Sequence, residues 1–400
     1  MVQDFIKEIL RLNMKKVLIK GYYGYENLGD DFILYTLLDT LSSVGKFDVT
    51  VVSAGDKYTE LFNGFPNLNC SVMTKKWRKF SKIKELIRND YWIIGGGGLF
   101  PSESSADFNS LLSEIKLARF FHTKVCIYGI DINSITKKEN KKIWKEISQC
   151  VEFIVCRNRR TYNLLKEIDC KNIIKSSDIT FSVETPIEKE NNTECLKKIN
   201  CEQQKYILWA IPMPWFNNEY KEEVHGERYK KLVTDIQKAA NQECNKGLKH
   251  VFLPFYYDMD MKIISDIVKG IDGEYVICDK AKELTIEEKR QLFKFAKACV
   301  SMRFHGVMFS LYHQTPVAII SYSNKTSDVI KEYGLQGDLI EYGIRPNADF
   351  YSEFDLQSDK LNQIISTIVM NKTQTDYATI SAKLKENAVR AKKILQDWFK

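Results

Sequence analysis

The stretch KKVLIKGYYGYENLGDDFILYTLLDTL, residues 15–41, decides the fold. It begins with an apolar run, turns at glycines, and continues with Ile33, Leu37 and Leu41 at the four-residue spacing of one helix face. A second apolar run, FDVTVVSA at residues 47–54, follows as a strand. A strand, a helix and a strand in this order predict a βαβ unit with parallel strands.

The same alternation continues along the chain. Further strands are predicted at residues 91–100, 123–130 and 151–158, with helical stretches between them. Residues 184–204 are charged and rich in asparagine, so we interpret them as a linker. The alternation restarts at residue 205 with KYILWAI. Strands that alternate with helices predict mostly parallel sheets covered on both faces.

We therefore predict an α/β chain with two Rossmann-like domains that face a cleft. A length of 400 residues agrees, because single cores stop growing at about 250–300 residues. The predicted parts are an N-terminal domain at 1–183, the linker at 184–204, a C-terminal domain at 205–379, and an amphipathic helix at 380–400 that packs across the domain junction.

Composition and charge exclude several classes of protein. The chain has 44% hydrophobic and 28% charged residues and contains no apolar run long enough to span a bilayer. Its first residues lack the features of a secretory signal, and its ten cysteines form no C-x-x-C pair. We expect a cytoplasmic protein without a metal site, and a net charge of +7 does not require a nucleic-acid partner.

One basic segment leaves a membrane contact open. KKWRKFSKIK, residues 75–84, places Trp77 and Phe80 among lysines and arginine. A basic helix with interleaved aromatic residues can lie on an anionic membrane surface, whereas a solvated helix face has the same pattern. Peripheral contact with the inner face of the cell membrane is therefore one of two interpretations.

Two glycine-rich segments are candidate ligand sites. In GYYGYENLGDD, residues 21–31, glycines allow close backbone approach, and Asn27 and Asp30 lie at the start of a helix. These two residues either cap the helix or bind a polar ligand. The second segment is Gly95–Gly98, where Gly96 and Gly97 are expected to let a ligand approach. Its spacing is not G-x-G-x-x-G, so a dinucleotide is not indicated.

Cationic side chains follow two later strands. Arg157 leaves a predicted strand, and a guanidinium can bind a carboxylate through two parallel hydrogen bonds. SMRFHGVMFSLYHQTPVAIISYSNK, residues 301–325, places Arg303, His305 and Lys325 at strand ends and helix starts. Such positions bind anions, because backbone N–H groups and the helix dipole point at the ligand. A phosphate or a carboxylate is the expected ligand.

Taken in order, these motifs make the chain similar to the polysaccharide pyruvyl transferase family. The resemblance rests on G-x-x-G-x-x-N-x-G-D at Gly21 to Asp30, the glycine run at Gly95 to Gly98, Arg157 with Asp178 downstream, and the segment from Met302 to Lys325. It implies a bacterial cell-surface role and a glycosyltransferase B-type (GT-B) fold. It also implies transfer of a pyruvyl group from phosphoenolpyruvate to two hydroxyls of one sugar, with release of phosphate and without a cofactor. The acceptor would be a glycan or a lipid-linked saccharide.

The resemblance also implies roles for individual residues. Arg157, His305 and Lys325 resemble donor-site residues, with Arg303 beside them, and Asn27 and Asp30 resemble the N-terminal contribution. We expect His305 to act as the acid and Asp30, unless it only caps its helix, as the base.

The chain departs from the family pattern in two places, which leaves the acceptor open. Where relatives often have an arginine, it has AIPMPWF at residues 210–216, and Asn158 rather than an acid follows Arg157. Trp215 and Phe216 are candidates for a surface on which the acceptor sugar stacks.

Two other functions stay open at this point. A GT-B glycosyltransferase with a nucleotide-sugar donor would use Arg303 and Lys325 for phosphates but would not need Arg157 for a carboxylate. A glycan-binding protein without activity would have no reason to keep His305 beside these cations. The sequence carries no signal for the acceptor sugar, the ketal linkage or the oligomeric state.

Overall fold

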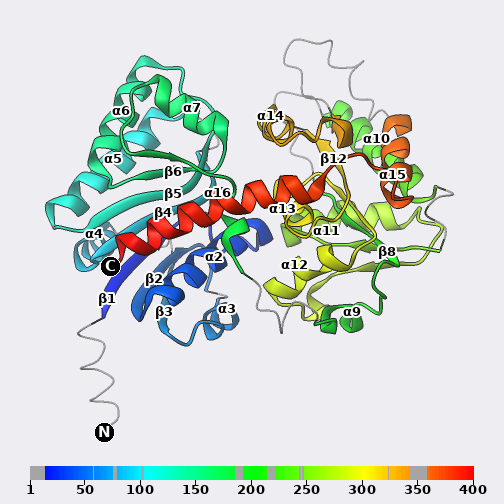
Figure 1. Ribbon diagram of the computed structural model, residues 1–400, viewed down its shortest axis with the longest axis horizontal. Coiled ribbons are helices and arrows are strands. Elements are labelled where there is room, and N and C mark those ends of the chain that lie inside the picture. Colours follow the sequence, from blue (N-terminus) through cyan, green and yellow to red (C-terminus); the bar gives the residue numbers. More distant parts are fainter. Residues whose placement is uncertain are drawn as a thin grey trace, which may run out of the picture. The chain divides into compact units, whose positions relative to one another are not determined.

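In a computed structural model, the structure describes residues 14–56, 58–74, 79–100, 103–184, 192–213, 222–242, 245, 247–322, 324–342 and 358–400. The chain divides into two compact units, each with its own parallel sheet (Figure 1). The N-terminal unit comprises Met1–Glu184 together with Leu384–Lys400, and the C-terminal unit comprises Thr185–Lys383. The prediction of two Rossmann-like α/β domains is confirmed.

The N-terminal unit is built on a seven-stranded sheet in the order β3-β2-β1-β4-β5-β6-β7. All neighbours are parallel, with Val17 of β1 opposite Val49 of β2 and Tyr91 of β4. Strands covered on both faces need apolar side chains on both sides, which explains the apolar runs in the sequence. The strands are β1 (Lys15–Lys20), β2 (Phe47–Ser53), β3 (Leu68–Thr74), β4 (Tyr91–Phe100), β5 (Lys124–Ile132), β6 (Ile154–Cys156) and β7 (Ile173–Lys175).

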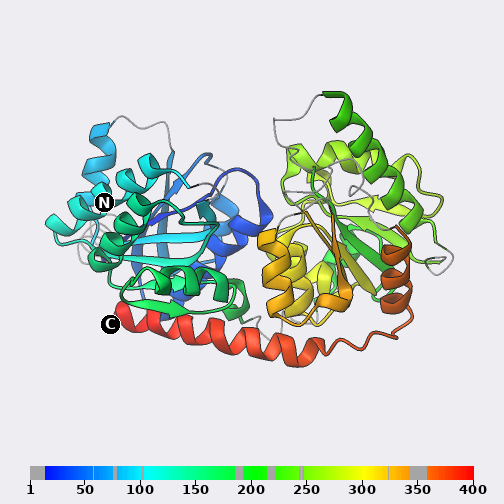
Figure 2. The same ribbon diagram turned by 90° about the horizontal axis from the view of Figure 1, so that it is seen from above.

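Helices cover both faces of this sheet (Figures 1 and 2). Ile33, Leu37 and Leu41 of α2 are fully buried, as their spacing predicted. One face packs against α2 (Leu28–Val44) and α3 (Thr59–Asn63). The other packs against α4 (Lys79–Arg88), α5 (Ser105–Phe120), α6 (Lys138–Cys150) and α7 (Arg159–Glu167), and the 3-10 helix η1 (Ile179–Ser182) follows β7.

The C-terminal unit repeats this topology with a six-stranded parallel sheet in the order β10-β9-β8-β11-β12-β13. The strands are β8 (Tyr206–Ala210), β9 (Lys249–Phe252), β10 (Tyr275–Ile277), β11 (Ala298–Ser301), β12 (Val317–Ser321) and β13 (Leu339–Glu341). One face packs against α10 (Glu222–Ala240), α11 (Tyr257–Val268) and α15 (Ser358–Val369). The unit also contains the helices α12 (Ile286–Phe295), α13 (Phe304–Tyr312), α14 (Asn324–Glu332), η3 (Lys280–Lys282) and η4 (Gln336–Asp338).

Within residues 184–204, where we predicted a linker, the described part forms a short helix. This helix, α9 (Glu194–Lys198), buries Cys195 and Leu196 and contacts α12 of the C-terminal unit. Two buried side chains on a helix of five residues are too few to give an apolar periodicity, so the sequence pattern did not reveal it.

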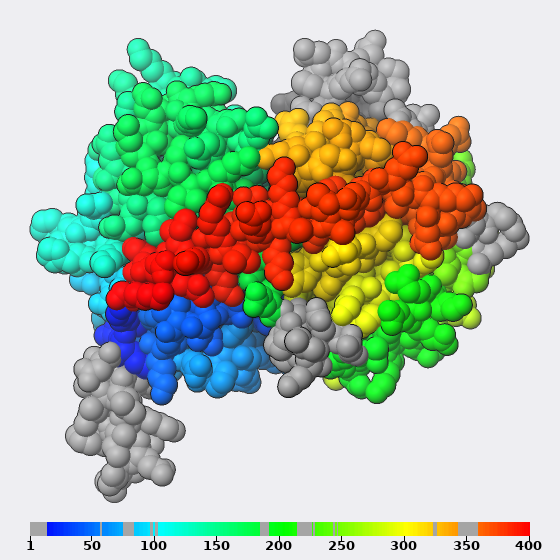
Figure 3. Space-filling model, viewed as in Figure 1, coloured from blue at the N-terminus to red at the C-terminus, as the bar shows by residue number. Residues whose placement is uncertain are grey.

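The C-terminal helix α16 (Tyr377–Trp398) changes units along its length. From Leu384 onward the chain belongs to the N-terminal unit, where Ala391, Leu395 and Phe399 are buried in the core that contains Phe47 and Tyr91. Figure 3 shows this red segment lying over the blue and green parts of that unit. The predicted packing of residues 380–400 across the domain junction stays a prediction.

Both sheets reverse their strand order next to their first strand. The reversal lies between β1 and β4 in the N-terminal unit and between β8 and β11 in the C-terminal unit. In open α/β sheets, ligands bind outside the carboxyl ends of the strands at such a point. The segments after β1, β4, β8 and β11 are therefore the places to look for a site.

Candidate functional site

Asn27 and Asp30 lie together at the first turn of α2. The Asn27 side chain accepts a hydrogen bond from the Gly29 amide at 3.2 Å, and its Nδ2 donates to Oδ2 of Asp30 at 2.7 Å. Asp30 is 8% exposed. Asn27 therefore caps the helix and also orients the Asp30 carboxylate, so the capping and functional interpretations are both compatible with the geometry.

Gly95 and Gly96 belong to strand β4 and pack closely against α2. A Cβ at Gly96, which has φ +85°, would lie 2.4 Å from Cγ2 of Ile33, and one at Gly95 would lie 2.9 Å from Cδ1 of Leu37. Close contact between the strand and the helix thus requires these two glycines. The predicted ligand contact of Gly96 and Gly97 stays a prediction beside this structural role.

Arg157 follows β6 and is held by two buried carboxylates. Its Nη2 lies 2.8 Å from Oδ2 of Asp131, its Nη1 lies 3.6 Å from Oδ2 of Asp178, and its side chain is 6% exposed. Burial lowers the pKa of Arg157, but the charges of Asp131, Asp178 and Asp30 outweigh burial and raise it overall. The two carboxylates would therefore compete with a substrate carboxylate for this guanidinium.

The sequence did not point to Asp131, which lies near the carboxyl end of β5 and bonds to several side chains there. Its carboxylate accepts hydrogen bonds from Arg157, from Arg160 at 3.1 Å and from the Thr161 hydroxyl at 3.0 Å, and it is 1% exposed. The sequence signal that could have found it is an aspartate near the end of the apolar run at 123–132. A buried acid at such a position requires hydrogen-bond or ion-pair partners.

Arg303 precedes helix α13 in the C-terminal unit. Its guanidinium pairs with the fully buried Asp260, while its backbone N–H donates to the Ser301 hydroxyl at 3.2 Å. Asp260 also accepts the amides of Met213, Phe255 and Tyr256 at 2.9–3.1 Å. One carboxylate therefore ties the loops after β8 and β9 to Arg303, which follows β11.

His305 lies in the first turn of the same helix, two residues after Arg303. Its half-buried ring contacts Phe304 and Phe309, with ring centroids 5.5 and 6.3 Å apart. The helix start comes this close to β11 because residue 306 is glycine: a Cβ there would lie 2.3 Å from the Ser301 hydroxyl. Arg303 and His305 thus share the N-terminal end of α13, as predicted.

The described backbone places Lys325 in the first turn of α14, after β12. Its side chain lies outside the described residues, and so do Trp215, Phe216 and residues 75–78 of the basic segment. The donor role of Lys325, the stacking surface at Trp215 and Phe216, and the membrane contact stay predictions.

The two units bring together different sets of predicted residues. The carboxyl edge of the N-terminal sheet carries Asn27, Asp30 and Arg157, with Asp131 and Asp178 adding negative charge. The carboxyl edge of the C-terminal sheet carries Arg303, His305 and the start of α14. The first set combines carboxylates and an amide with the buried Arg157 guanidinium, whereas the second places a guanidinium and an imidazole at a helix N-terminus, so they suit different ligands.

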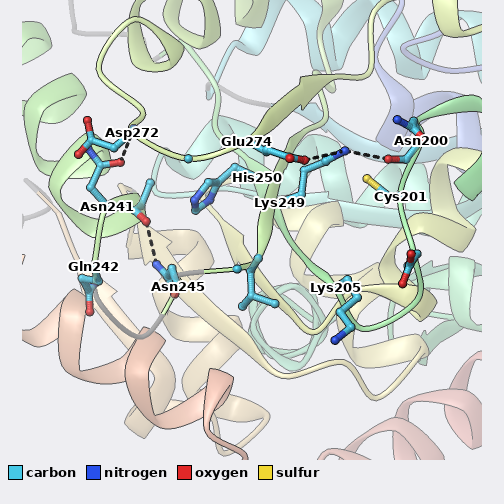
Figure 4. Close-up of a pocket in the computed structure, with 15 residues that line it drawn as sticks. Asn200, Cys201, Lys205, Asn241, Gln242, Asn245, Lys249, His250, Asp272 and Glu274 are labelled. Atoms are coloured by element: carbon cyan, nitrogen blue, oxygen red, sulfur yellow. Dashed lines mark hydrogen bonds and ion pairs between the residues drawn. The ribbon is translucent and has the colours of Figure 1, made fainter.

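A pocket of about 650 Å³ opens at the amino ends of strands β8, β9 and β10 (Figure 4). His250 lies there with Nδ1 accepting from the Trp209 indole at 3.1 Å, and burial lowers its pKa to about 4. Lys249 contacts the Asn200 carbonyl at 2.8 Å and Glu274 at 3.2 Å. None of the described side chains that line this pocket belongs to the predicted site, so we place the candidate site at the carboxyl edges.

The described residues contain neither a candidate membrane span nor a candidate metal site. None of their helices combines the length and the hydropathy that a bilayer crossing requires. Across the same described ranges, histidine, cysteine, aspartate and glutamate side chains form no group of three or more arranged to hold a metal ion.

Solved structures of low sequence identity share the fold. UDP-GlcNAc 2-epimerase from Methanocaldococcus jannaschii aligns with a TM-score of 0.60 at 13% identity, covering 96% of this chain and 99% of that chain. The enzyme of the same name from Neisseria meningitidis, bound to UDP-GlcNAc, gives 0.57 at 10% identity with coverages of 96% and 99%. A glycosyltransferase from Rickettsia africae gives 0.52 at 12% identity with coverages of 96% and 94%. The GT-B architecture predicted from the sequence is thereby confirmed.

A family model identifies the relatives more specifically than the fold does. No curated protein matches the chain. The model for polysaccharide pyruvyl transferase, however, matches residues 27–324. The match begins at Asn27, includes Asp30, Arg157, Arg303 and His305, and ends just before Lys325. It covers most of the chain, so the protein belongs to the polysaccharide pyruvyl transferase family, a family of transferases.

Proposed function

We propose that this protein transfers the pyruvyl group of phosphoenolpyruvate to two hydroxyls of one sugar, forming a cyclic ketal and releasing phosphate. The acceptor sugar belongs to a cell-surface glycan or its lipid-linked precursor. The observation that carries the proposal is the placement of Arg303 and His305 at the N-terminal end of α13, at the topological switch point of the sheet. The match to the family model supports it.

Charge supports a donor site in the C-terminal unit, although the family resemblance placed Arg157 of the N-terminal unit with the donor. Phosphoenolpyruvate carries a carboxylate and a phosphate, and a helix N-terminus with an arginine attracts both groups. The carboxyl edge of the N-terminal sheet carries three aspartates, Asp30, Asp131 and Asp178, against the two arginines Arg157 and Arg160, so a dianion is less favourable there than a neutral sugar. In this assignment the acceptor sugar binds at the N-terminal sheet, where Asn27 orients Asp30 and Arg157 orients Asp131 and Asp178. Gly96 and Gly97 lie beside this acceptor site.

His305 is the proposed acid of the first step. Its proton goes to the methylene carbon of the enol, the neighbouring carbon becomes electrophilic, and a sugar hydroxyl attacks that carbon. The second hydroxyl of the same sugar then displaces the phosphate, which leaves with the proton of that hydroxyl. One phosphoenolpyruvate and one diol thus give one ketal and one phosphate, and no step passes through a metal or a cofactor.

Asp30 is the proposed base for the attacking hydroxyl. Its carboxylate is oriented by Asn27 and attracted by the charge of Arg157. The proton taken from the hydroxyl balances the one that His305 supplies.

Phosphate release from phosphoenolpyruvate, measured with and without methyl hexopyranosides of gluco, galacto and manno configuration, tests the proposal. We expect release only with an acceptor present, and a loss of about 100-fold or more in His305→Gln, the usual contribution of a general acid. His122→Asn is the matched control, because His122 is exposed and outside the site. Normal turnover in His305→Gln would remove the histidine from the chemistry.

Calorimetric titration separates the proposal from the nucleotide-sugar alternative. Phosphoenolpyruvate should bind the wild-type protein, and Arg303→Met should weaken this binding at least tenfold. Binding of UDP-GlcNAc or a GDP-sugar without binding of phosphoenolpyruvate would overturn the donor assignment and favour a glycosyltransferase. Binding of methyl hexopyranosides without any turnover of phosphoenolpyruvate would favour a glycan-binding protein.

A further inference from the structure

Two tyrosines form a stacked pair in the loop after β1. The rings of Tyr22 and Tyr25 are parallel to within 16°, with centroids 4.2 Å apart. Tyr22 is 40% exposed, among the most exposed large apolar side chains of the described residues. The pair, with Tyr22 exposed and Tyr25 half-buried, therefore lies in the loop at the topological switch point of the N-terminal sheet.

Hydrogen bonds to neighbouring elements fix the backbone of the loop that carries the pair. Tyr23, between the two, is fully buried and donates to the Gly95 carbonyl at 3.2 Å. The Gly24 amide donates to the Tyr58 hydroxyl at 2.5 Å, and that hydroxyl donates to Asp31 of α2 at 2.5 Å. These bonds tie the loop to β4, to the segment after β2 and to α2. The loop that carries the two rings is therefore preorganised, which reduces the entropy lost on binding.

The backbone of this loop is also strained at the residue before Asn27. Glu26 has φ +55°, a left-handed conformation that non-glycine residues rarely adopt. Gly24 has φ +83°, and a Cβ there would lie 2.1 Å from the Ser53 hydroxyl. Strained backbone persists where the surroundings over-determine it, and it clusters at ligand sites.

We propose that the exposed face of the Tyr22–Tyr25 pair is the platform on which a ring of the acceptor sugar stacks, with its hydroxyls directed to Asn27 and Asp30. This inference rests on the proposed function, which requires a saccharide acceptor. An aromatic ring offers an apolar face to the C–H groups of a sugar, and the neighbouring amide and carboxylate bind hydroxyls. Trp215 and Phe216, which lie outside the described residues, stay a separate prediction for such a stacking surface.

The charge around the pair selects among ligands that can stack on tyrosine. Glu26, Asp30 and Asp31 follow the pair within the same loop and helix turn. A nucleobase could stack as well as a sugar, but a nucleotide brings phosphates that these carboxylates repel. The platform therefore suits a neutral polyhydroxylated ring.

Saturation-transfer NMR with the methyl hexopyranosides, without phosphoenolpyruvate, tests the platform directly. We expect at least one of the glycosides to receive saturation at its ring C–H groups in the wild-type protein. Tyr22→Ala should lower the affinity for that glycoside about tenfold, whereas Tyr22→Phe should keep it because the ring face remains. Tyr275→Ala is the control, since Tyr275 is 47% exposed and lies in the other unit.

The outcomes separate the platform from the donor chemistry. Wild-type glycoside affinity in Tyr22→Ala, or no glycoside binding to the wild type, overturns the platform, and so does binding of UMP to the pair in place of glycosides. Phosphoenolpyruvate affinity by calorimetry should be the same in Tyr22→Ala and wild type. Glycoside binding that depends on Tyr22, in a protein that never cleaves phosphoenolpyruvate, supports the platform and rejects the proposed function.

Discussion

At the scale of single residues, Asp260 decides where the Arg303 guanidinium lies. Asp260→Asn replaces one of two acceptor oxygens by an NH2 donor. That donor faces either the amides of Phe255 and Tyr256 or the Met213 amide and Arg303, and the substitution removes the partner of a charge. Breaking a buried ion pair on one side is destabilising by about 3–5 kcal/mol. We expect urea unfolding to show a loss of this order and calorimetry to show weaker binding of phosphoenolpyruvate.

A control and a double substitution separate positioning from stability. Asp266→Asn removes an aspartate of the same helix whose carboxylate bonds to Lys269 and Tyr229 near the surface, so it should change stability by about 1 kcal/mol or less. If Asp260 acts through Arg303, then Arg303→Met and the double variant bind phosphoenolpyruvate equally weakly. Wild-type affinity in a folded Asp260→Asn protein would contradict the positioning role.

His250 gives a second prediction at this scale, on pH. Burial lowers its pKa to about 4 from about 6.5 in the unfolded chain, so the folded protein holds the neutral ring. The free energy of unfolding is unaffected by this group above pH 6.5 and decreases as the pH falls from there through 4, because the unfolded chain binds the proton first. The decrease amounts to about 2 kcal/mol at pH 5. His250→Asn can keep an acceptor for the Trp209 indole and removes the titration. Urea unfolding curves at pH 7 and pH 5 should therefore show a smaller decrease in the free energy of unfolding between these two pH values in this variant than in the wild type.

At the scale of elements, replacing two helical glycines by alanine should change the stability of the protein in opposite directions. Gly306 lies in α13, where a Cβ would meet the Ser301 hydroxyl at 2.3 Å and Cβ of Ala210 at 3.2 Å. Gly306→Ala should therefore destabilise the protein by about 1–3 kcal/mol and displace His305. Gly226 lies in α10 with nothing within 4 Å of its Cβ position, so Gly226→Ala should stabilise by about 0.5–1 kcal/mol.

Thermal unfolding and phosphate release measure this pair of substitutions together. The expected pattern is a lower Tm with reduced turnover for Gly306→Ala, and a higher Tm with unchanged turnover for Gly226→Ala. Equal turnover in both variants would show that the close contact between α13 and β11 does not position the site.

Elements also show how far the sequence predicts this protein. The strand at residues 15–20 and the helix at Ile33, Leu37 and Leu41 follow from local periodicity, and the structure confirms both. The ion pairs of Arg157 with Asp131 and Asp178 could not be predicted in this way, because they join residues about 20–26 positions apart through the order of strands. Asp260 was missed for the same reason, since its partners come from the segments after three different strands.

At the scale of the whole molecule, the end of the chain completes the first unit. Phe399 is 1% exposed and packs against Phe47 and Tyr91, while Lys392 bonds to Asp39 and Gln396 to Ser43 of α2. Leu384 and Asn387 accept hydrogen bonds from Ser177 and Ser176 after β7. The core of the N-terminal unit is therefore incomplete until the last residues of the chain are in place.

Substitutions in Leu384–Lys400, or its deletion, should destabilise the N-terminal unit and leave the C-terminal unit unchanged. Phe399→Ala removes a buried aromatic side chain and should destabilise the protein by about 3–5 kcal/mol, whereas the exposed Lys385→Ala should stay within about 0.5 kcal/mol. In a chain that ends at Lys383, hydrogen exchange should show lost amide protection in β1 and β4 and unchanged protection in β8 and β11. Equal loss in both sheets would contradict the assignment of Leu384–Lys400 to the N-terminal unit, because damage confined to one core leaves the amides of the other protected.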